Sequence, residues 1–180
     1  GGVKFPALKT LFVWDCDSLK SMPLDVTNFP ELETLVVAYC VNLDLDLWKD
    51  HHEEQSPKLK LKVVGFCGLP QLVGLPQWLQ ETANSLQTLI ISMCNNLEML
   101  PEWLSTLTNL KVLRISYCRK LISLPDNIHH LIALEHLDLR GCPELCKKCQ
   151  PHVREFWFKI SHIKEVYIDE PKEVEEEEEE

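Results

Sequence analysis

One string of apolar residues returns along this chain at nearly constant intervals. Its clearest copy reads Leu86-x-x-Leu89-x-Ile91-x-x-Cys94-x-x-Leu97-x-x-Leu100-Pro101. Full or partial copies begin at Leu8, Leu32, Leu61, Leu110 and Leu134. Taken in chain order, the first leucines of the copies are separated by 24, 29, 25, 24 and 24 residues. A pattern that recurs this regularly predicts a fold made by stacking one structural unit.

The sequence pattern and the length of the repeat indicate the structural class of this stacked fold. Leucine-rich repeats are about 20 to 29 residues long and read L-x-x-L-x-L before an Asn or Cys position. We therefore expect an α/β repeat solenoid with the shape of a horseshoe. Strand alternation turns the second leucine of L-x-x-L-x-L and the next apolar residue inward. Successive strands then form one parallel sheet on the concave side, opposite an irregular or 3₁₀ convex side.

The residues that follow each predicted strand favour a chain that turns back along the convex side. Pro101 and Pro125 have no N–H to donate to a strand ladder, so each marks the end of the strand side of its repeat. Further apolar residues continue the convex packing, namely Leu104, Leu107, Ile128 and Leu131.

The periodicity also predicts the domain organisation. Residues 1–168 form about six repeats, and Ile163-x-x-Val166-x-Ile168 adds a terminal strand-like unit. We expect this domain to be truncated at its N-terminal end, because residues 1–7 cannot cap the first repeat. The polar run 49–57 should form a convex loop, and residues 169–180 an acidic, disordered tail. Three aromatic residues are predicted to cover the last core layer: Phe156, Trp157 and Phe158.

Charge and composition exclude some classes of partner and indicate a compartment. The chain has a formal net charge of -10, and residues 169–180 hold nine acidic residues and one lysine. The nearly neutral body lacks the clustered Lys and Arg that nucleic acid or an anionic membrane requires, so we expect neither partner. No apolar run approaches the roughly 20 residues that a membrane span needs. No asparagine begins a glycosylation sequon, which favours a cytoplasmic, reducing setting.

The residues that point outward from the strands have no packing role, and they are the candidates for binding. They are apolar and aromatic in the early repeats and charged in the late ones, which is what the centres of protein interfaces favour. An alternative is that Arg114 and Asp138 only pair with each other across neighbouring strands. The predicted protein-binding residues on the concave face are Phe12, Trp14, Val36, Tyr39, Ile90, Met93, Arg114, Tyr117, Asp138 and Arg140.

Several cysteines and histidines are candidates for metal binding or catalysis. Cys142, Cys146, Cys149 and His152 could in principle hold zinc, but they are spaced more compactly than familiar structural sites. No serine or cysteine is placed beside a histidine by any catalytic motif. We therefore predict no enzyme activity, no metal and no cofactor in this chain. One cysteine column is predicted to face inward and bond to neighbouring backbone: Cys16, Cys40, Cys94, Cys118 and Cys142.

The ending of the chain resembles one family in particular. Gly141-Cys142-Pro143-Glu144-Leu145, residues 157–163 and Val166-Tyr167-Ile168-Asp169 are similar to the closing segment of plant intracellular immune receptors. In these coiled-coil nucleotide-binding leucine-rich-repeat disease resistance proteins, a nucleotide-binding switch precedes the repeats. The chain departs from the family in lacking its P-loop, G-x-x-x-x-G-K-[ST], and in having Lys164 where a proline is usual.

The resemblance implies a function and a set of partners. Such receptors detect pathogen effectors or guarded host proteins in the defence response, and their repeats also hold the nucleotide-binding domain inactive. A nucleotide would then bind an upstream domain and not this chain. An alternative from another class is the substrate-recruiting repeat domain of a ubiquitin-ligase subunit, which would carry an F-box upstream.

Overall fold

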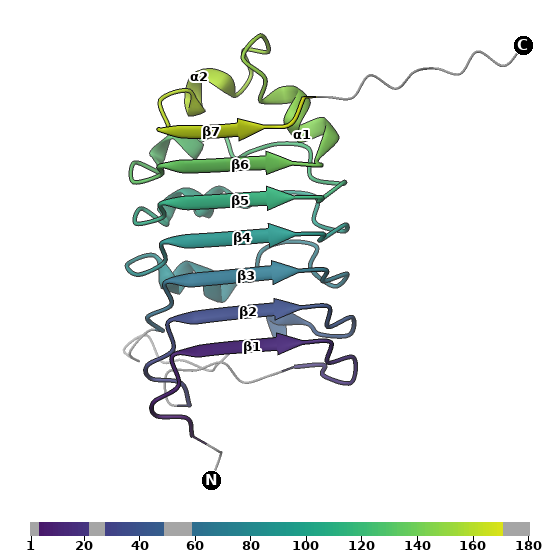
Figure 1. Cartoon of the computed structure of the whole chain (residues 1–180), viewed down its shortest axis with the longest axis vertical. Coiled ribbons are helices and arrows are strands. Elements are labelled where there is room, and N and C mark those ends of the chain that lie inside the picture. Colours follow the sequence, from purple (N-terminus) through teal and green to yellow (C-terminus); the bar gives the residue numbers. More distant parts are fainter. Residues whose placement is uncertain (1–3, 22–27, 49–58, 171–180) are drawn as a thin grey trace, which may run out of the picture.

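The computed structural model describes residues 4–21, 28–48 and 59–170. The predicted loop at 49–57 and most of the predicted tail lie outside these residues. In the described part, each repeat contributes one short strand to a single sheet (Figure 1). The strands are β1 (Thr10–Trp14), β2 (Thr34–Ala38), β3 (Val63–Cys67), β4 (Thr88–Ser92), β5 (Val112–Ser116), β6 (His136–Arg140) and β7 (Glu165–Ile168).

The sheet is parallel throughout and follows the order of the chain from β1 to β7. Equivalent repeat positions lie side by side, as Leu89, Leu113 and Leu137 do on β4, β5 and β6. The strands are parallel because every repeat enters the sheet in the same direction and returns behind it. The predicted solenoid with a parallel concave sheet is confirmed.

Short helical turns form the convex side behind the sheet (Figure 1). Pro76 and Pro101 are extended, with φ of -64° and -71°, and each directly precedes a 3₁₀ turn. The predicted 3₁₀ flank and its buried residues, Leu104, Leu107, Ile128 and Leu131, are confirmed. The 3₁₀ turns are η1 (Leu45–Trp48), η2 (Gln77–Thr82), η3 (Glu102–Thr106) and η4 (Ile128–His130), and the α-helices are α1 (Pro143–Lys148) and α2 (Trp157–Ile160).

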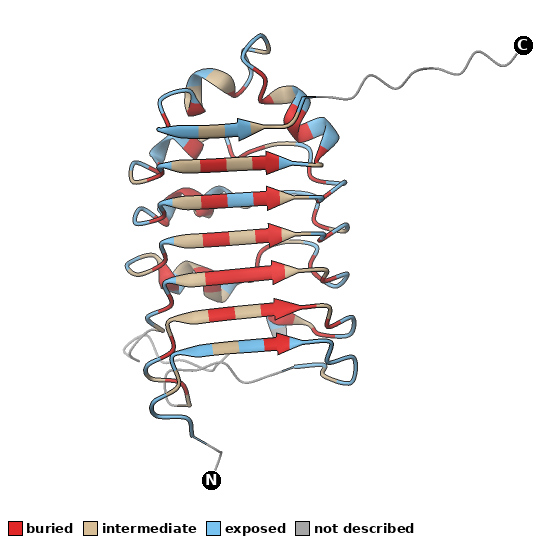
Figure 2. Cartoon of the chain, viewed as in Figure 1, coloured by how far each residue is buried: buried red, intermediate tan, exposed pale blue. Residues whose placement is uncertain are grey.

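One continuous hydrophobic core runs between the sheet and the convex turns. Buried and less buried residues alternate along most strands, as Figure 2 shows by colour. On β5, Leu113 and Ile115 are fully buried while Arg114 between them is exposed. The core therefore depends on alternate strand residues, and the residues between them form the opposite face of the sheet.

The last core layer is covered by fewer aromatic residues than the sequence predicts. Phe156 is buried and Trp157 packs partly buried against the core, but Phe158 is 66% exposed. Consecutive helical residues are rotated by about 100° about the helix axis, so three in a row cannot all face one surface. The prediction of a cover is correct for the first two residues and wrong for Phe158.

The opposite end of the described sheet leaves β1 without a strand on its outer side. Leu11 on β1 is partly exposed whereas its register partner Leu35 is fully buried, and Cys16 is exposed whereas Cys40 is buried. An apolar sheet edge of this kind pairs readily with another chain.

We expect concentration-dependent self-association in sedimentation velocity, and a monomer in the variant Leu11→Lys, because a charged edge resists pairing. A concentration-independent monomer for the unaltered chain would contradict this expectation.

Candidate protein-binding face

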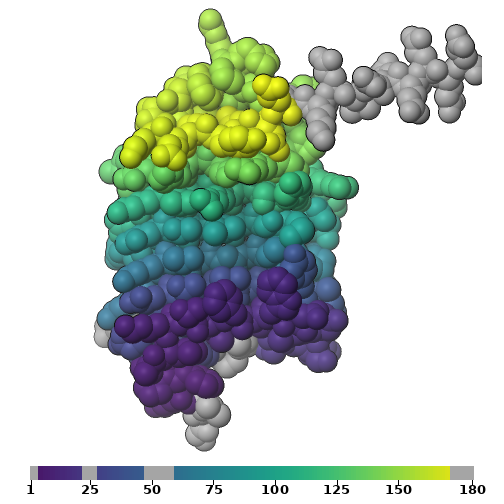
Figure 3. Space-filling view, viewed as in Figure 1, coloured from purple at the N-terminus to yellow at the C-terminus, as the bar shows by residue number. Residues whose placement is uncertain are grey.

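Two rows of outward side chains run across the concave sheet in register. The first row joins Phe12, Val36, Gly65, Ile90, Arg114, Asp138 and Tyr167 across the strands from β1 to β7. The second joins Trp14, Ala38, Cys67, Ser92, Ser116 and Arg140 from β1 to β6. The strands thus bring together side chains that are far apart in sequence, and in Figure 3 the repeats form successive bands across this face.

A third row follows directly after the strands, and its backbone is unusual. Asp15, Tyr39, Met93 and Tyr117 have φ between 53° and 56°, and the two remaining members are glycines with φ of 58° and 59°. This left-handed conformation is costly for residues with a Cβ and easy for glycine. Sequence reasoning placed these side chains on the concave face but missed their backbone conformation, for which the two glycines at the same repeat position were the available signal.

Each tyrosine of the third row lies over the glycine of the next repeat. A Cβ added to Gly68 would stand 2.6 Å from the ring of Tyr39, and one added to Gly141 would stand 2.4 Å from the ring of Tyr117. The missing glycine side chain therefore leaves the space in which the ring rests. The left-handed turn and the glycine together hold the tyrosines against the sheet while much of the ring surface of Tyr117 stays exposed.

The early repeats carry an aromatic cluster on this face. The rings of Trp14 and Tyr39 meet edge to face with centroids 4.8 Å apart, and the Tyr39 hydroxyl lies 3.9 Å from Sδ of Met93. A hydrogen bond with the Cys67 thiol raises the pKa of Tyr39. Phe12 and Trp14 are 64% and 60% exposed. Large apolar rings held in place and exposed to solvent are suited to contact another protein.

Two members of the rows are not available to a partner. Ala38 is fully buried and Gly65 is also buried, although alternation predicted that both face outward without a packing role. A Cβ on Gly65 would lie 3.4 Å from the side chain of Val36. Small residues on this face are covered by the larger ones beside them, so its accessible part consists of the longer side chains.

The late repeats carry a charged network in which Asp138 pairs with Arg140 and not with Arg114. Arg140 donates to both carboxylate oxygens of Asp138, with Nε at 2.7 Å and Nη2 at 2.9 Å, and its guanidinium lies 4.3 Å from the centroid of the Tyr167 ring. The bond to Asp138 raises the pKa of Arg140. Among the described residues Arg114 makes no ion pair with Asp138, its register partner, and it is exposed. The alternative interpretation of these residues is therefore wrong.

The same network continues to the end of the sheet. The Tyr167 hydroxyl lies 3.3 Å from Oδ1 of Asp169, whose Oδ2 accepts a hydrogen bond of 2.8 Å from the Gly141 backbone N–H. Gln150 donates to the Asp169 carbonyl oxygen at 2.7 Å. Asp169 therefore belongs to the folded end of the solenoid and not to the tail that was predicted to begin there. Arg140 and Asp138 have a structural role, which leaves Arg114 as the freer cation of this face.

The cysteine column follows the predicted arrangement. The thiol of each member donates to the carbonyl oxygen two residues earlier, as Cys40 does to Ala38 at 3.3 Å and Cys142 to Arg140 at 3.3 Å. Cys40 also reaches the Val13 carbonyl oxygen of the preceding repeat at 3.9 Å. The inward cysteines close the end of each strand, and Cys16 alone among the five is exposed because it belongs to the first described repeat.

The four residues that could have held zinc are divided by burial. Cys142, Cys146 and Cys149 are buried and His152 is exposed. Cys146 donates to the Leu139 carbonyl oxygen at 3.6 Å. Within the part of the chain that the structure describes, no group of three potential metal ligands gathers. Two of the three thiols therefore have backbone partners that account for their positions.

Burial should protect most thiols from alkylation. Burial raises the pKa of Cys149 to about 12, and a hydrogen bond with Cys118 together with burial raises that of Cys142. Because the thiolate is the reactive form, we expect iodoacetamide at pH 8 to modify Cys16 rapidly and these two cysteines only after denaturation. Peptide mass spectrometry over a time course would measure this. Equal labelling of Cys16 and Cys149 in the folded chain would contradict the expectation.

Comparisons with known proteins agree with the architecture. The family described as Leucine Rich Repeat matches residues 85–107 and 109–131. A protein of Solanum bulbocastanum, "Disease resistance protein RGA2", is 31% identical over 106 residues, which is 58% of this chain and 10% of that protein. The chain thus aligns with about a tenth of the length of this relative. In the described ranges, no helix combines the length and apolarity needed to cross a bilayer. The parallel sheet and the 3₁₀ turns give the chain the architecture of a leucine-rich-repeat solenoid, and two of its repeats match that family.

Proposed function

We propose that this chain is the protein-recognition and autoinhibitory module of a plant immune receptor that acts in the cytoplasm in defence against pathogens. The observation that carries the proposal is a sheet face of exposed aromatic residues and a free arginine in a chain similar to a plant disease resistance protein. On this proposal the chain binds proteins and catalyses no reaction, and any nucleotide is bound by another domain.

The concave face has the composition of an interface centre. Aromatic residues, Met and Arg are enriched at such centres, because they bury much area and lose little side-chain entropy. Phe12, Trp14 and Tyr117 are more than half exposed, and Met93 lies among them in the third row. Exposed apolar rings gathered on one face are typical of protein-interaction sites, which supports contact with a partner here.

The division of the face into two chemically different parts supports two kinds of contact. The early repeats present the rings of Phe12 and Trp14, while the fifth described strand presents the guanidinium of Arg114. A pathogen effector or a guarded host protein and the receptor's own nucleotide-binding domain would then use adjoining parts of one surface. Competition between them would couple recognition to release of the switch.

The proposal is tested by exchanging residues of the face in the complete protein, expressed in leaves that are then challenged with the pathogen. The variants are Phe12→Ser with Trp14→Ser, and separately Arg114→Glu. Arg119→Glu is the matched control, because Arg119 is exposed in the turn after β5 and does not belong to the rows. Asp138 and Arg140 are left unaltered, since they hold each other in the charged network.

We expect the face variants either to lose the pathogen-triggered response or to cause cell death without the pathogen, at unaltered protein abundance. Arg119→Glu should behave as the original protein does. Normal signalling by both face variants would exclude the concave face from recognition and from autoinhibition.

A further inference from the structure

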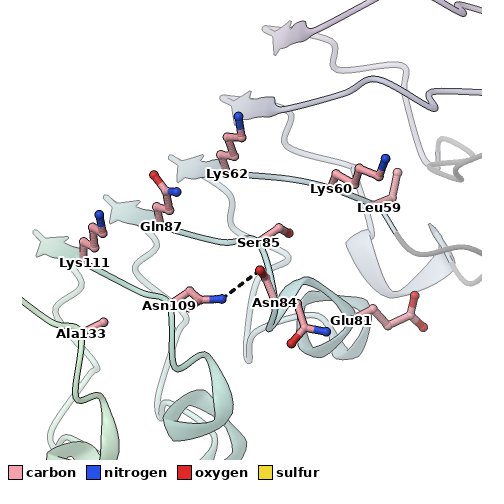
Figure 4. A pocket seen from close by; sticks show the side chains of 10 residues that line it. All are labelled: Leu59, Lys60, Lys62, Glu81, Asn84, Ser85, Gln87, Asn109, Lys111 and Ala133. Atoms are coloured by element: carbon pink, nitrogen blue, oxygen red, sulfur yellow. Dashed lines mark hydrogen bonds between the residues drawn. The ribbon is translucent and has the colours of Figure 1, made fainter.

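A second candidate surface lies at the edge of the sheet where the strands begin, away from the concave rows. It is a groove with a volume of about 630 Å³ between the starts of the central strands and the ends of the convex turns (Figure 4). Eight of its ten lining residues have polar side chains. The lining residues are Leu59, Lys60, Lys62, Glu81, Asn84, Ser85, Gln87, Asn109, Lys111 and Ala133.

Three of the lining side chains form a row set by the repeat. Lys62, Gln87 and Lys111 each directly precede a strand, and Figure 4 shows their side chains pointing the same way from neighbouring strand starts. The Lys62 carbonyl oxygen accepts hydrogen bonds from the backbone N–H groups of Gln87 and Thr88, at 2.8 and 3.0 Å. The Gln87 carbonyl oxygen likewise accepts hydrogen bonds from the backbone N–H groups of Lys111 and Val112. The backbone of the row is therefore fixed, and its side chains are presented at regular spacing.

Polar groups form the side of the groove that faces the convex turns. The side-chain amide of Asn109 donates to the Asn84 carbonyl oxygen at 2.8 Å, which fixes the bend between η2 and β4 (Figure 4). The Ser85 hydroxyl lies 3.3 Å from the Thr82 carbonyl oxygen. The amides of Gln87 and Asn84 line the groove as well and offer both donors and acceptors.

The groove is basic although the chain as a whole has a formal net charge of -10. It is lined by three lysines and by one acidic residue, Glu81. Lys62 has a partly exposed ion pair with Glu33 at 3.2 Å. Among the described residues, Lys60 and Lys111 form no ion pair, and both side chains are exposed.

We propose that this groove binds an extended acidic segment of a partner protein, lying across the strand starts along the solenoid axis. Neighbouring strands are about 4.8 Å apart, so Lys62 and Lys111, two strands apart, are separated by roughly 10 Å. A peptide in the extended polyproline II conformation has three residues per turn and advances about 3.1 Å per residue, so carboxylates three residues apart lie on one face about 9 Å apart. The Gln87 amide lies between Lys62 and Lys111 in the row of strand starts, where it can bond to the backbone of such a peptide between the charges.

Nucleic acid fits the groove less well than an acidic peptide does. Single-stranded nucleic acid is bound by aromatic side chains that stack on bases beside a continuous basic track. The groove lining contains no aromatic residue, and Glu81 interrupts the positive charge. Short, evenly spaced carboxylates match separated lysines better than a continuous phosphate backbone does.

The test uses acetylated octaglutamate as the probe and isothermal titration calorimetry of the full chain at low salt. The groove variant carries Lys60→Ser and Lys111→Ser, and the matched control carries Lys120→Ser and Lys147→Ser. All four lysines are exposed, and both variants change the net charge equally. We expect the groove variant to weaken binding at least tenfold and the control to weaken it less than twofold, with an unaltered melting temperature in both.

Other results would overturn the proposal. Equal weakening by both variants would show that the probe responds only to total charge. Tighter binding of an eight-nucleotide single-stranded DNA than of octaglutamate would assign the groove to nucleic acid. Binding of octaglutamate only after removal of residues 171–180 would make the chain's own acidic end the occupant, and no binding in either form would exclude an acidic segment. These residues are distinct from the concave rows, so each result is independent of the proposed function.

Discussion

Replacing Leu113 by alanine should lower the free energy of unfolding by about 2 to 5 kcal/mol, the range found for buried leucines. Leu113 is fully buried on the central part of the sheet, between the equally buried Leu89 and Leu137 of the neighbouring strands. Loss of the isobutyl group leaves a cavity that the regular stack on both sides cannot collapse to fill. Urea denaturation followed by circular dichroism would measure the change.

The matched control lies next to it on the same strand. Arg114 is exposed on the concave face and forms no ion pair among the described residues, so Arg114→Ala should alter the free energy of unfolding by no more than about 0.5 kcal/mol. Similar losses for the two variants would mean that the alternation along β5 is not as described.

Gly141→Ala should destabilise the chain by about 2 to 5 kcal/mol, although it adds only one methyl group to a turn. Its φ of 58° costs an L residue roughly 1 to 2 kcal/mol. The new Cβ would also stand 2.4 Å from a ring atom of Tyr117, and crowding of this kind typically costs about 1 to 3 kcal/mol. The shift in the midpoint of urea denaturation, multiplied by the dependence of the unfolding free energy on urea concentration, gives the total loss of stability.

Two further variants separate the contributions. The double variant Tyr117→Ala with Gly141→Ala removes the ring and should lose only the backbone part relative to Tyr117→Ala alone. Gly74→Ala is the control, because a Cβ there meets nothing within 4 Å and the residue is not among those with positive φ. A loss at Gly74 as large as that at Gly141 would refute the steric explanation.

The repeat pattern predicted the fold well because it encodes burial directly. The pattern predicts that Leu86, Leu89 and Ile91 point into the core, and each of them is fully buried. The strand positions, the parallel order and the 3₁₀ flank follow from repeating that unit, since each repeat can bury its leucines only against its neighbours. The outward rows followed from the same alternation, and the register confirms their alignment across the sheet.

What the sequence did not predict depends on how neighbouring side chains meet. Register gave Arg114 and Asp138 as neighbours, but Arg140 binds Asp138 from the same strand, because the Tyr167 ring supports its guanidinium. Burial of Ala38 likewise depends on the sizes of its neighbours and not on the direction in which it points. The groove at the strand starts was not predicted, because it depends on how the residues before the strands of several repeats lie relative to the convex turns.

The one-to-one register between strands has a consequence for how such a surface can change in evolution. The repeats that contain β4 and β5 begin 24 residues apart and present equivalent positions side by side. Loss of one such 24-residue unit, for example residues 86–109, would place Gly65 beside Arg114 and leave every inward leucine with a partner. Unequal recombination between repeats could therefore move the aromatic cluster one strand closer to the charged network in a single event. The binding face can therefore gain or lose the outward residues of a whole repeat at once, while the core that supports the face keeps its packing.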